Sequence, residues 1–163
     1  MLGWDEASQN GSFVPGNNPF GDQNGGKGIS DSFVAQNADI IMPVAGGSGL
    51  GTAAAALSSN GKYSVIWVDQ DGCVSAAQYC SVFLSTVVKN IPDAVNDTLT
   101  KAADGTLQGG SGSIGTLANN GVQLAPYHDF DSKVPADLKS EIEKLKSDIS
   151  SGTIKLTSPS EPK

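Results

Sequence analysis

The sequence has no arginine, a single histidine and two cysteines among its 163 residues. Its 10 basic side chains are therefore all lysines, and against 17 Asp and Glu they leave a formal net charge of −7. Nucleic-acid-binding surfaces are basic because they neutralise phosphates. The charge balance therefore argues against DNA or RNA as a partner.

Long apolar runs are also missing. No stretch approaches the roughly 18 apolar residues that a membrane-spanning helix needs. The first residues, MLGWDEASQNG, have neither the basic nor the apolar region of a signal peptide. We expect neither feature in this sequence, whose length is sufficient for one domain with a hydrophobic core.

The two cysteines, Cys73 and Cys80, stand seven positions apart in the segment DGCVSAAQYC. They are candidates for a disulfide that closes a small loop, and two separate buried thiols are the alternative. Their spacing matches no common zinc motif, and the single histidine, His128, is far from them in the sequence. We therefore favour the disulfide and expect no metal and no cofactor.

Residues 38–71 have the pattern of a βαβ unit. The apolar run 40–44 predicts a strand buried on both faces of a parallel sheet, and the glycines that follow it predict a tight turn. The alanine-rich run 52–59 predicts a helix, and the β-branched and aromatic run 63–68 predicts a second strand. An α/β fold with a parallel sheet follows from this order.

Further helices and strands alternate along the rest of the chain, which is typical of the same fold class. Apolar residues at helical spacing predict the helices, and β-branched or aromatic runs predict the strands. The helices are expected at 29–36, 92–103 and 135–150, and the strands at 81–88 and 122–125.

A ligand site is predicted beyond the carboxyl ends of the two strands of the βαβ unit, where ligands bind in open α/β sheets. The backbone amides of Gly46 and Gly47 can donate to hydroxyls or anions that approach closely, because no Cβ intervenes. Asp69 and Asp71 follow the second strand, and a carboxylate there can accept two hydrogen bonds from a ribose. A glycine turn that serves packing alone is the alternative.

The glycine turn matches the dinucleotide fingerprint G-x-G-x-x-G only in part. Thr52 stands where the third glycine belongs if the motif starts at Gly47, and Ser48 replaces the second glycine if it starts at Gly46. A domain of a cytosolic enzyme that binds an NAD-like cofactor is therefore the second hypothesis. Because no Ser-His-Asp or Cys-His order is present and His128 is remote from the acids, we expect no enzyme.

Nine segments along the chain form a distinctive series. They are GSFVPG, GGKG, NADIIMPVAGGSGLG, WVDQD, LSTVVKN, AADGTLQGG, NGVQLAPY, VPADLKSEIEKLK and ISSGTIK. In this order they resemble the carboxyl-terminal half of the basic membrane protein family, the nucleoside-binding lipoproteins of bacterial ABC transporters. The resemblance covers nearly the whole chain.

The resemblance implies half of a two-lobed, three-layer αβα fold of the type I periplasmic-binding-protein class, which closes on its ligand by hinge motion. Residues 1–90 would form the core of the ligand-binding lobe, 91–126 would cross to the other lobe, and 134–152 would be a returning helix. The amino-terminal lobe, the signal peptide and the lipid anchor would be absent from residues 1–163. The whole protein would be an extracytoplasmic, membrane-anchored lipoprotein that partners an ABC permease.

The resemblance also implies the ligand, a purine nucleoside, and the residues that hold its sugar. Gly46, Gly47 and Asp69 would bind the ribose hydroxyls, and Lys89 would reach the same sugar.

The base would lie against Phe13 or Met42. Many family members have an aromatic residue where this chain has Met42, a softer partner for a base.

Without the other lobe, apolar residues such as Ile91, Val95 and Leu99 would be exposed, and we expect two copies of the chain to pair through them.

Overall fold

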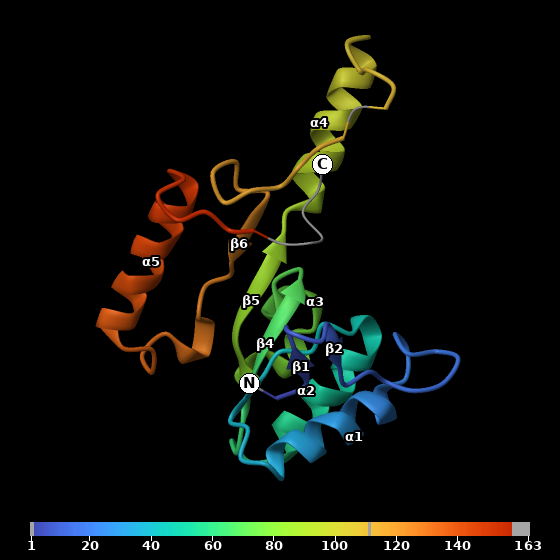
Figure 1. The fold of residues 1–163 in the computed structure, drawn as a ribbon, viewed down its shortest axis with the longest axis vertical. Coiled ribbons are helices and arrows are strands. Elements are labelled where there is room, and N and C mark those ends of the chain that lie inside the picture. The colour runs from blue at the N-terminus through green and yellow to red at the C-terminus, as the bar shows by residue number, and fades with distance from the viewer. Residues whose placement is uncertain (1, 111, 158–163) are drawn as a thin grey trace. The chain divides into compact units, whose positions relative to one another are not determined.

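The computed structural model describes residues 2–110 and 112–157 (Figure 1). The α-helices are α1 (Gln23–Val34), α2 (Gly49–Ser58), α3 (Gly72–Ser75), α4 (Ile91–Ala103) and α5 (Ala136–Ser150). The strands are β1 (Trp4–Asp5), β2 (Asn10–Gly11), β3 (Ile40–Ile41), β4 (Ser64–Asp69), β5 (Phe83–Lys89) and β6 (Val122–Leu124). Short 3-10 turns are η1 (Gly46–Ser48), η2 (Ala77–Val82) and η3 (His128–Phe130).

The chain divides into two compact units. The first comprises the described residues of 1–87 and 125–131, and the second those of 88–124 and 132–163. The first unit contains the βαβ segment, and the second contains α4, β6 and α5.

The strand β3 is the outer strand of a sheet with the order β3-β4-β5-β6. It runs parallel to β4, with Ile40 opposite Ser64 and Ile41 opposite Val65. The expectation of a five-residue strand buried on both faces is wrong, because β3 has only two residues and Val44 is 72% exposed. An edge strand has one neighbour instead of two, so its side chains are covered less.

The core of the first unit lies where α2 meets β4 and β5. Val65, Ala53 and Phe83 are almost fully buried there, and the rings of Trp67 and Phe83 pack 5.2 Å apart. The hydroxyl of Tyr63 donates to the backbone oxygen of Thr52 at 3.1 Å, and burial raises the pKa of Tyr63 to about 12.

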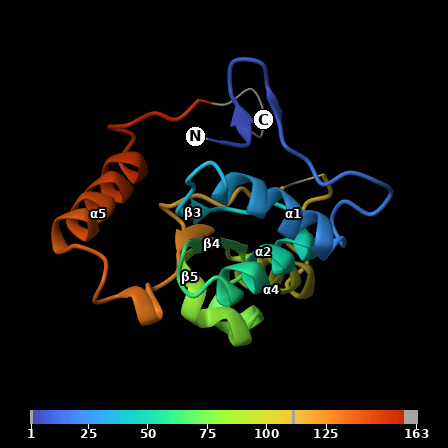
Figure 2. The ribbon, with the colours of Figure 1, turned by 90° about the horizontal axis from the view of Figure 1, so that it is seen from below.

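The helix α1 begins at Gln23, six residues before the expected start at Ile29. The side chain of Asp22 caps it by accepting a hydrogen bond from the Gly25 amide at 3.0 Å. Gly26 lies inside this helix, where a Cβ would stand 2.1 Å from the carbonyl oxygen of Ser48. The glycines therefore let α1 approach α2, beside which it lies in Figure 2.

The helices of the second unit are close to expectation. The helix α4 starts one residue before 92, after Asn90, whose side chain accepts from the Asp93 amide. The helix α5 starts one residue after 135 and ends at Ser150 as expected. Neither helix buries a residue. Among the described residues, no helix has the length and apolarity needed to cross a bilayer.

Candidate functional site

The glycine turn and Asp69 leave the sheet at the same edge. The strands β3 and β4 are parallel neighbours, so the segments that follow their last residues emerge on the same side. Gly46 comes five residues after Ile41, and Asp69 is the last residue of β4. This edge is where an open α/β sheet offers a ligand site.

The glycine turn is built from η1, which runs directly into α2. Gly46 has a φ of +54°, a conformation that glycine adopts without steric cost. Ser48 ties the turn to the loop before α1, because its amide donates to the Phe20 carbonyl at 3.1 Å and its hydroxyl to the Pro19 carbonyl at 2.6 Å. A Cβ on Gly47 would lie 3.0 Å from the Phe20 oxygen.

The glycines of the turn thus have a packing role, the alternative that the sequence left open. That role is compatible with ligand binding. The first amides of a helical turn have no acceptor within the turn, so they are the groups of this segment best suited to bind an oxygen from outside.

Asp69 has a strained backbone. Its φ is +71°, and the amide of Gln70 donates to the carbonyl of Val68 at 3.0 Å, so Asp69 is the central residue of a γ-turn of the rare, positive-φ kind. Such a conformation costs about 1–3 kcal/mol and is concentrated at ligand-binding sites. The exposed Asp69 therefore stands out as a functional residue by its backbone as well as by its position.

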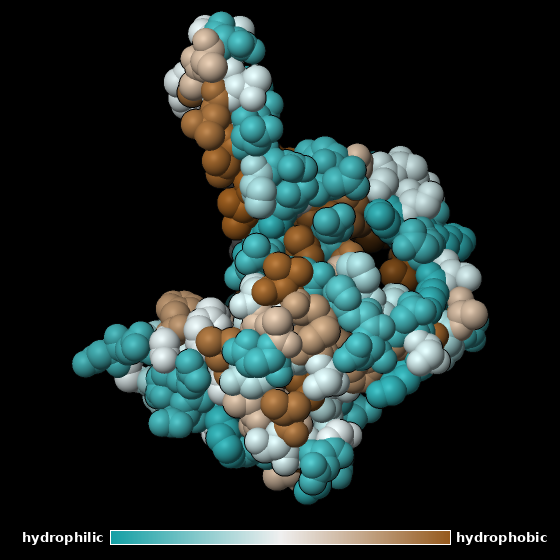
Figure 3. Space-filling model, turned by 180° about the vertical axis from the view of Figure 1, so that it is seen from behind, coloured by the Kyte–Doolittle hydropathy of each residue, from teal (hydrophilic) through white to brown (hydrophobic). Residues whose placement is uncertain are grey.

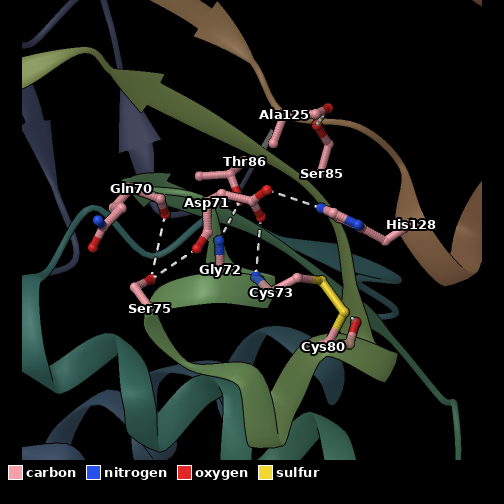
Figure 4. A network of polar contacts seen from close by, with 10 residues as sticks. All are labelled: Gln70, Asp71, Gly72, Cys73, Ser75, Cys80, Ser85, Thr86, Ala125 and His128. Atoms are coloured by element: carbon pink, nitrogen blue, oxygen red, sulfur yellow. Dashed lines mark hydrogen bonds and ion pairs between the residues drawn. A yellow bond between two sulfur atoms is a disulfide. The ribbon is translucent and has the colours of Figure 1, made fainter. Parts of the chain in front are cut away.

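Asp71 has a different role from Asp69 (Figure 4). One oxygen of its carboxylate accepts from the Cys73 amide at 3.0 Å and so caps α3. Its other oxygen lies 2.9 Å from Nε2 of His128. Both oxygens thus have protein partners, and Asp71 acts in the local structure of the loop.

His128 is the residue whose place the sequence did not reveal. The expectation that it is remote from the acids is wrong, because η3 brings it to Asp71 across a sequence separation of 57 residues. No signal in the sequence links the two residues.

Cys73 and Cys80 form a disulfide that joins α3 to η2. Donor atoms of Asp71, Cys73 and His128 lie within 4.8 Å of one another, an arrangement that could suit a metal ion. Cysteine binds a metal as its thiolate, however, and the sulfur of Cys73 is bonded to Cys80, so only Asp71 and His128 of these three residues can act as ligands.

Phe13 and Met42 line one apolar cavity of about 940 Å³ in the first unit. The cavity also includes Phe20, Phe33 and Ala45 in its wall, a composition typical of small-molecule pockets. Both predicted base contacts are accessible, since Phe13 is 70% and Met42 46% exposed.

The predicted sugar-binding residues Gly46, Gly47 and Asp69 are not among the residues that line this cavity, although Ala45 precedes Gly46 directly. Lys89, the last residue of β5, is grouped with the second unit, whereas the other predicted ligand residues are in the first.

Three comparisons with known proteins are consistent with one another. The family model described as ABC transporter substrate-binding protein PnrA-like (Bmp) matches residues 15–158. Over 150 residues the chain is 31% identical to a CD4+ T-cell-stimulating antigen of Listeria monocytogenes, covering 85% of this chain and 41% of that protein. Over 78 residues it is 37% identical to basic membrane protein B of Borrelia garinii subsp. bavariensis, covering 48% of this chain and 22% of that protein.

Among solved structures, an ABC transporter solute-binding protein of Aeropyrum pernix superposes with a TM-score of 0.74 at 19% identity, covering 87% of this chain and 46% of that one. A solute-binding protein of Conexibacter woesei superposes with a TM-score of 0.62 at 22% identity, covering 83% of this chain and 43% of that one. These likenesses confirm the expected α/β fold of the periplasmic-binding-protein type. The chain spans about two-fifths of the length of the Listeria relative.

Proposed function

The chain belongs to the family of PnrA-like ABC transporter substrate-binding proteins, and we propose that it is the ligand-recognition part of an extracytoplasmic solute-binding protein that feeds a bacterial ABC importer. The observation that carries the site is the parallel pairing of β3 and β4, which brings the glycine turn and the strained Asp69 to one sheet edge. In this proposal the chain binds and releases its ligand without catalysis.

The proposed ligand is a purine nucleoside. The exposed carboxylate of Asp69 accepts hydrogen bonds from two neighbouring ribose hydroxyls, and the amides of Gly46 and Gly47 donate to the sugar. Lys89 supplies a cationic donor to the same sugar. A net charge of −7 disfavours an anionic ligand such as a nucleotide.

The base of the nucleoside is proposed to lie against Phe13 or Met42. Both line the apolar cavity, whose wall reaches Ala45 at the start of the glycine turn. A base placed there would bury its faces against apolar side chains while its sugar lies at the strand ends.

The rest of the proposed assembly is supported by the family and by the chain's covering 41% of the Listeria relative. A second lobe would supply the opposite wall of the binding cleft, a lipid anchor would hold the protein at the membrane, and a permease would receive the ligand. Half of a closing cleft cannot desolvate its ligand, so we expect weak or undetectable nucleoside binding by this chain alone.

Calorimetric titration of a full-length protein containing this sequence with adenosine, guanosine, inosine and NAD tests the proposal. We expect at least one nucleoside to bind and NAD not to bind. Binding of NAD without any nucleoside would instead support the second hypothesis, a nucleotide-cofactor domain of an enzyme, and binding of neither would contradict the proposed ligand.

We also propose that the isolated chain forms a homodimer through one face of α4. Ile91, Val95 and Leu99 repeat every four residues and are 56%, 51% and 63% exposed. Figure 3 shows apolar side chains along this helix. Such a row is self-complementary when two copies pack antiparallel.

Light scattering of the isolated chain is expected to give twice the monomer mass, and Val95→Lys is expected to give the monomer, because it places a charge in the middle of the apolar row. Thr100→Lys, at an exposed position on the opposite side of the same helix, is the matched control and should leave the dimer intact. A monomer at all concentrations in the unmodified chain would contradict this pairing.

A further inference from the structure

The strained turn at Asp69 needs an explanation, because a strained backbone persists only where the surrounding structure holds it in place. The loop that follows Asp69 is attached to the rest of the first unit at three points within four residues. The first is a buried hydrogen bond of 3.0 Å from the Gly72 amide to the hydroxyl of Thr86 in β5. Thr86 is 1% exposed, so water does not compete for this bond.

The second attachment is the pair formed by Asp71 and His128, 2.9 Å apart. His128 can hold the loop because its own segment is anchored to β5. The carbonyl of Ala125 accepts from the Ser85 hydroxyl at 2.9 Å, and the amide of Ala125 donates to the Thr86 carbonyl at 2.9 Å. Ser85 and Thr86 are both buried.

The third attachment is the disulfide between Cys73 and Cys80. The amide of Cys73 donates to the carboxylate of Asp71, and the disulfide links Cys73 to the turn η2. Figure 4 shows that His128, which contacts Asp71, and Cys80, which is bonded to Cys73, come from different segments of the chain. The two attachments thus restrain the loop independently, four residues or fewer beyond Asp69.

We propose that the Asp71–His128 pair and the Cys73–Cys80 disulfide together form a brace that holds Asp69 in its strained turn and so sets the preference for a ribose diol. Asp71 and His128 are positioning residues in this account, because they act through Asp69. The inference rests on the proposed function for the ligand but not for the brace itself. The proposal assigns a structural role to His128, Cys73 and Cys80, which are not among the proposed ligand-binding residues.

The brace is tested first without ligand, by amide hydrogen exchange of the isolated chain. In His128→Ala and in the double variant Cys73→Ala, Cys80→Ala, the amides of Gln70 and Gly72 should exchange roughly tenfold faster or more, because the γ-turn and the bond to Thr86 open more often. The amide of Val65, in the middle of the sheet, should not change. His128→Gln keeps an N–H donor near the position of Nε2 and should restore slow exchange.

The second readout is the ratio of affinities for a ribonucleoside and its 2′-deoxy counterpart, measured in the full-length protein. A brace variant should lower this ratio severalfold, because Asp69 no longer meets both hydroxyls, whereas a loss of stability alone would weaken both ligands equally. Asp31→Asn, which removes an exposed ion pair with Lys27 on α1, is the matched control and should leave the ratio unchanged.

The possible outcomes separate the two claims. Unchanged exchange at Gln70 and Gly72 in both variants would overturn the brace. Faster exchange with an unchanged ratio, in a protein that binds nucleosides, would overturn its role in selectivity. If the unmodified full-length protein binds no nucleoside, the proposed function fails, and the exchange data still decide whether the brace holds Asp69.

Discussion

Replacing Asp69 with alanine is expected to weaken ribonucleoside binding by the full-length protein roughly 100-fold or more. A carboxylate that accepts from two hydroxyls loses two charge-assisted hydrogen bonds, each of which contributes about 1.5–3 kcal/mol. The change in affinity is measured by calorimetric titration of the unmodified and Asp69→Ala proteins. Asp31→Asn, which removes another exposed carboxylate of the first unit, should leave the affinity unchanged.

A second substitution distinguishes the loss of the Asp69 carboxylate from an effect on the stability of the fold. Asp69→Gly removes the same side chain but is compatible with a φ of +71°. It should weaken binding as much as alanine does, while the free energy of unfolding stays the same or rises. The strain of about 1–3 kcal/mol is relieved, and the larger conformational entropy that glycine loses on folding offsets about 0.5–1 kcal/mol of this gain. Affinity within twofold of the unmodified protein in either variant would show that Asp69 does not contact the ligand.

Replacing Gly51 with alanine is expected to destabilise the chain by about 3 kcal/mol or more, a large part of a typical domain's stability. A Cβ at this position would lie 1.8 Å from the backbone oxygen of Gln23, the first residue of α1. A backbone atom inside a helix cannot move aside as a side chain can. The helix α1 must therefore move away from α2, which contains Gly51. Urea unfolding monitored by circular dichroism measures the loss.

Gly28→Ala is the matched control for Gly51→Ala. Gly28 is in α1 and exposed, and a Cβ there would have no neighbour within 4 Å. Alanine favours a helix over glycine, so this variant should be more stable by about 0.5–1 kcal/mol. Equal stability of the two variants would mean that α1 and α2 do not pack as closely as described.

The parts of the fold that sequence predicts well are those set by local signals. The helices α4 and α5 start within one residue of expectation, because Pro92 and Pro135 mark their first turns and apolar residues repeat along them. The start of α1 is not predictable in this way, because glycines are poor helix formers and the close approach of Gly26 to Ser48 depends on the tertiary structure. The exposure of β3 was missed because strand order is not a local property.

The candidate site divides in the same way. That the glycine turn and Asp69 share a sheet edge follows from a parallel βαβ unit and was predictable. The strained turn at Asp69 was not, because nothing in the sequence marks an aspartate with positive φ. The pairing of Asp71 with His128 was not predictable either, since it depends on how the segment after β6 lies against β5.

The central claim is that the glycine turn and Asp69 bind one sugar. A crystal structure of the full-length protein with a bound ribonucleoside tests it most directly. We expect two ribose hydroxyls within about 3 Å of the Asp69 carboxylate, and a backbone amide of Gly46 or Gly47 within hydrogen-bond distance of the same sugar. A nucleoside held entirely inside the apolar cavity, with its ribose away from Asp69, would contradict the account.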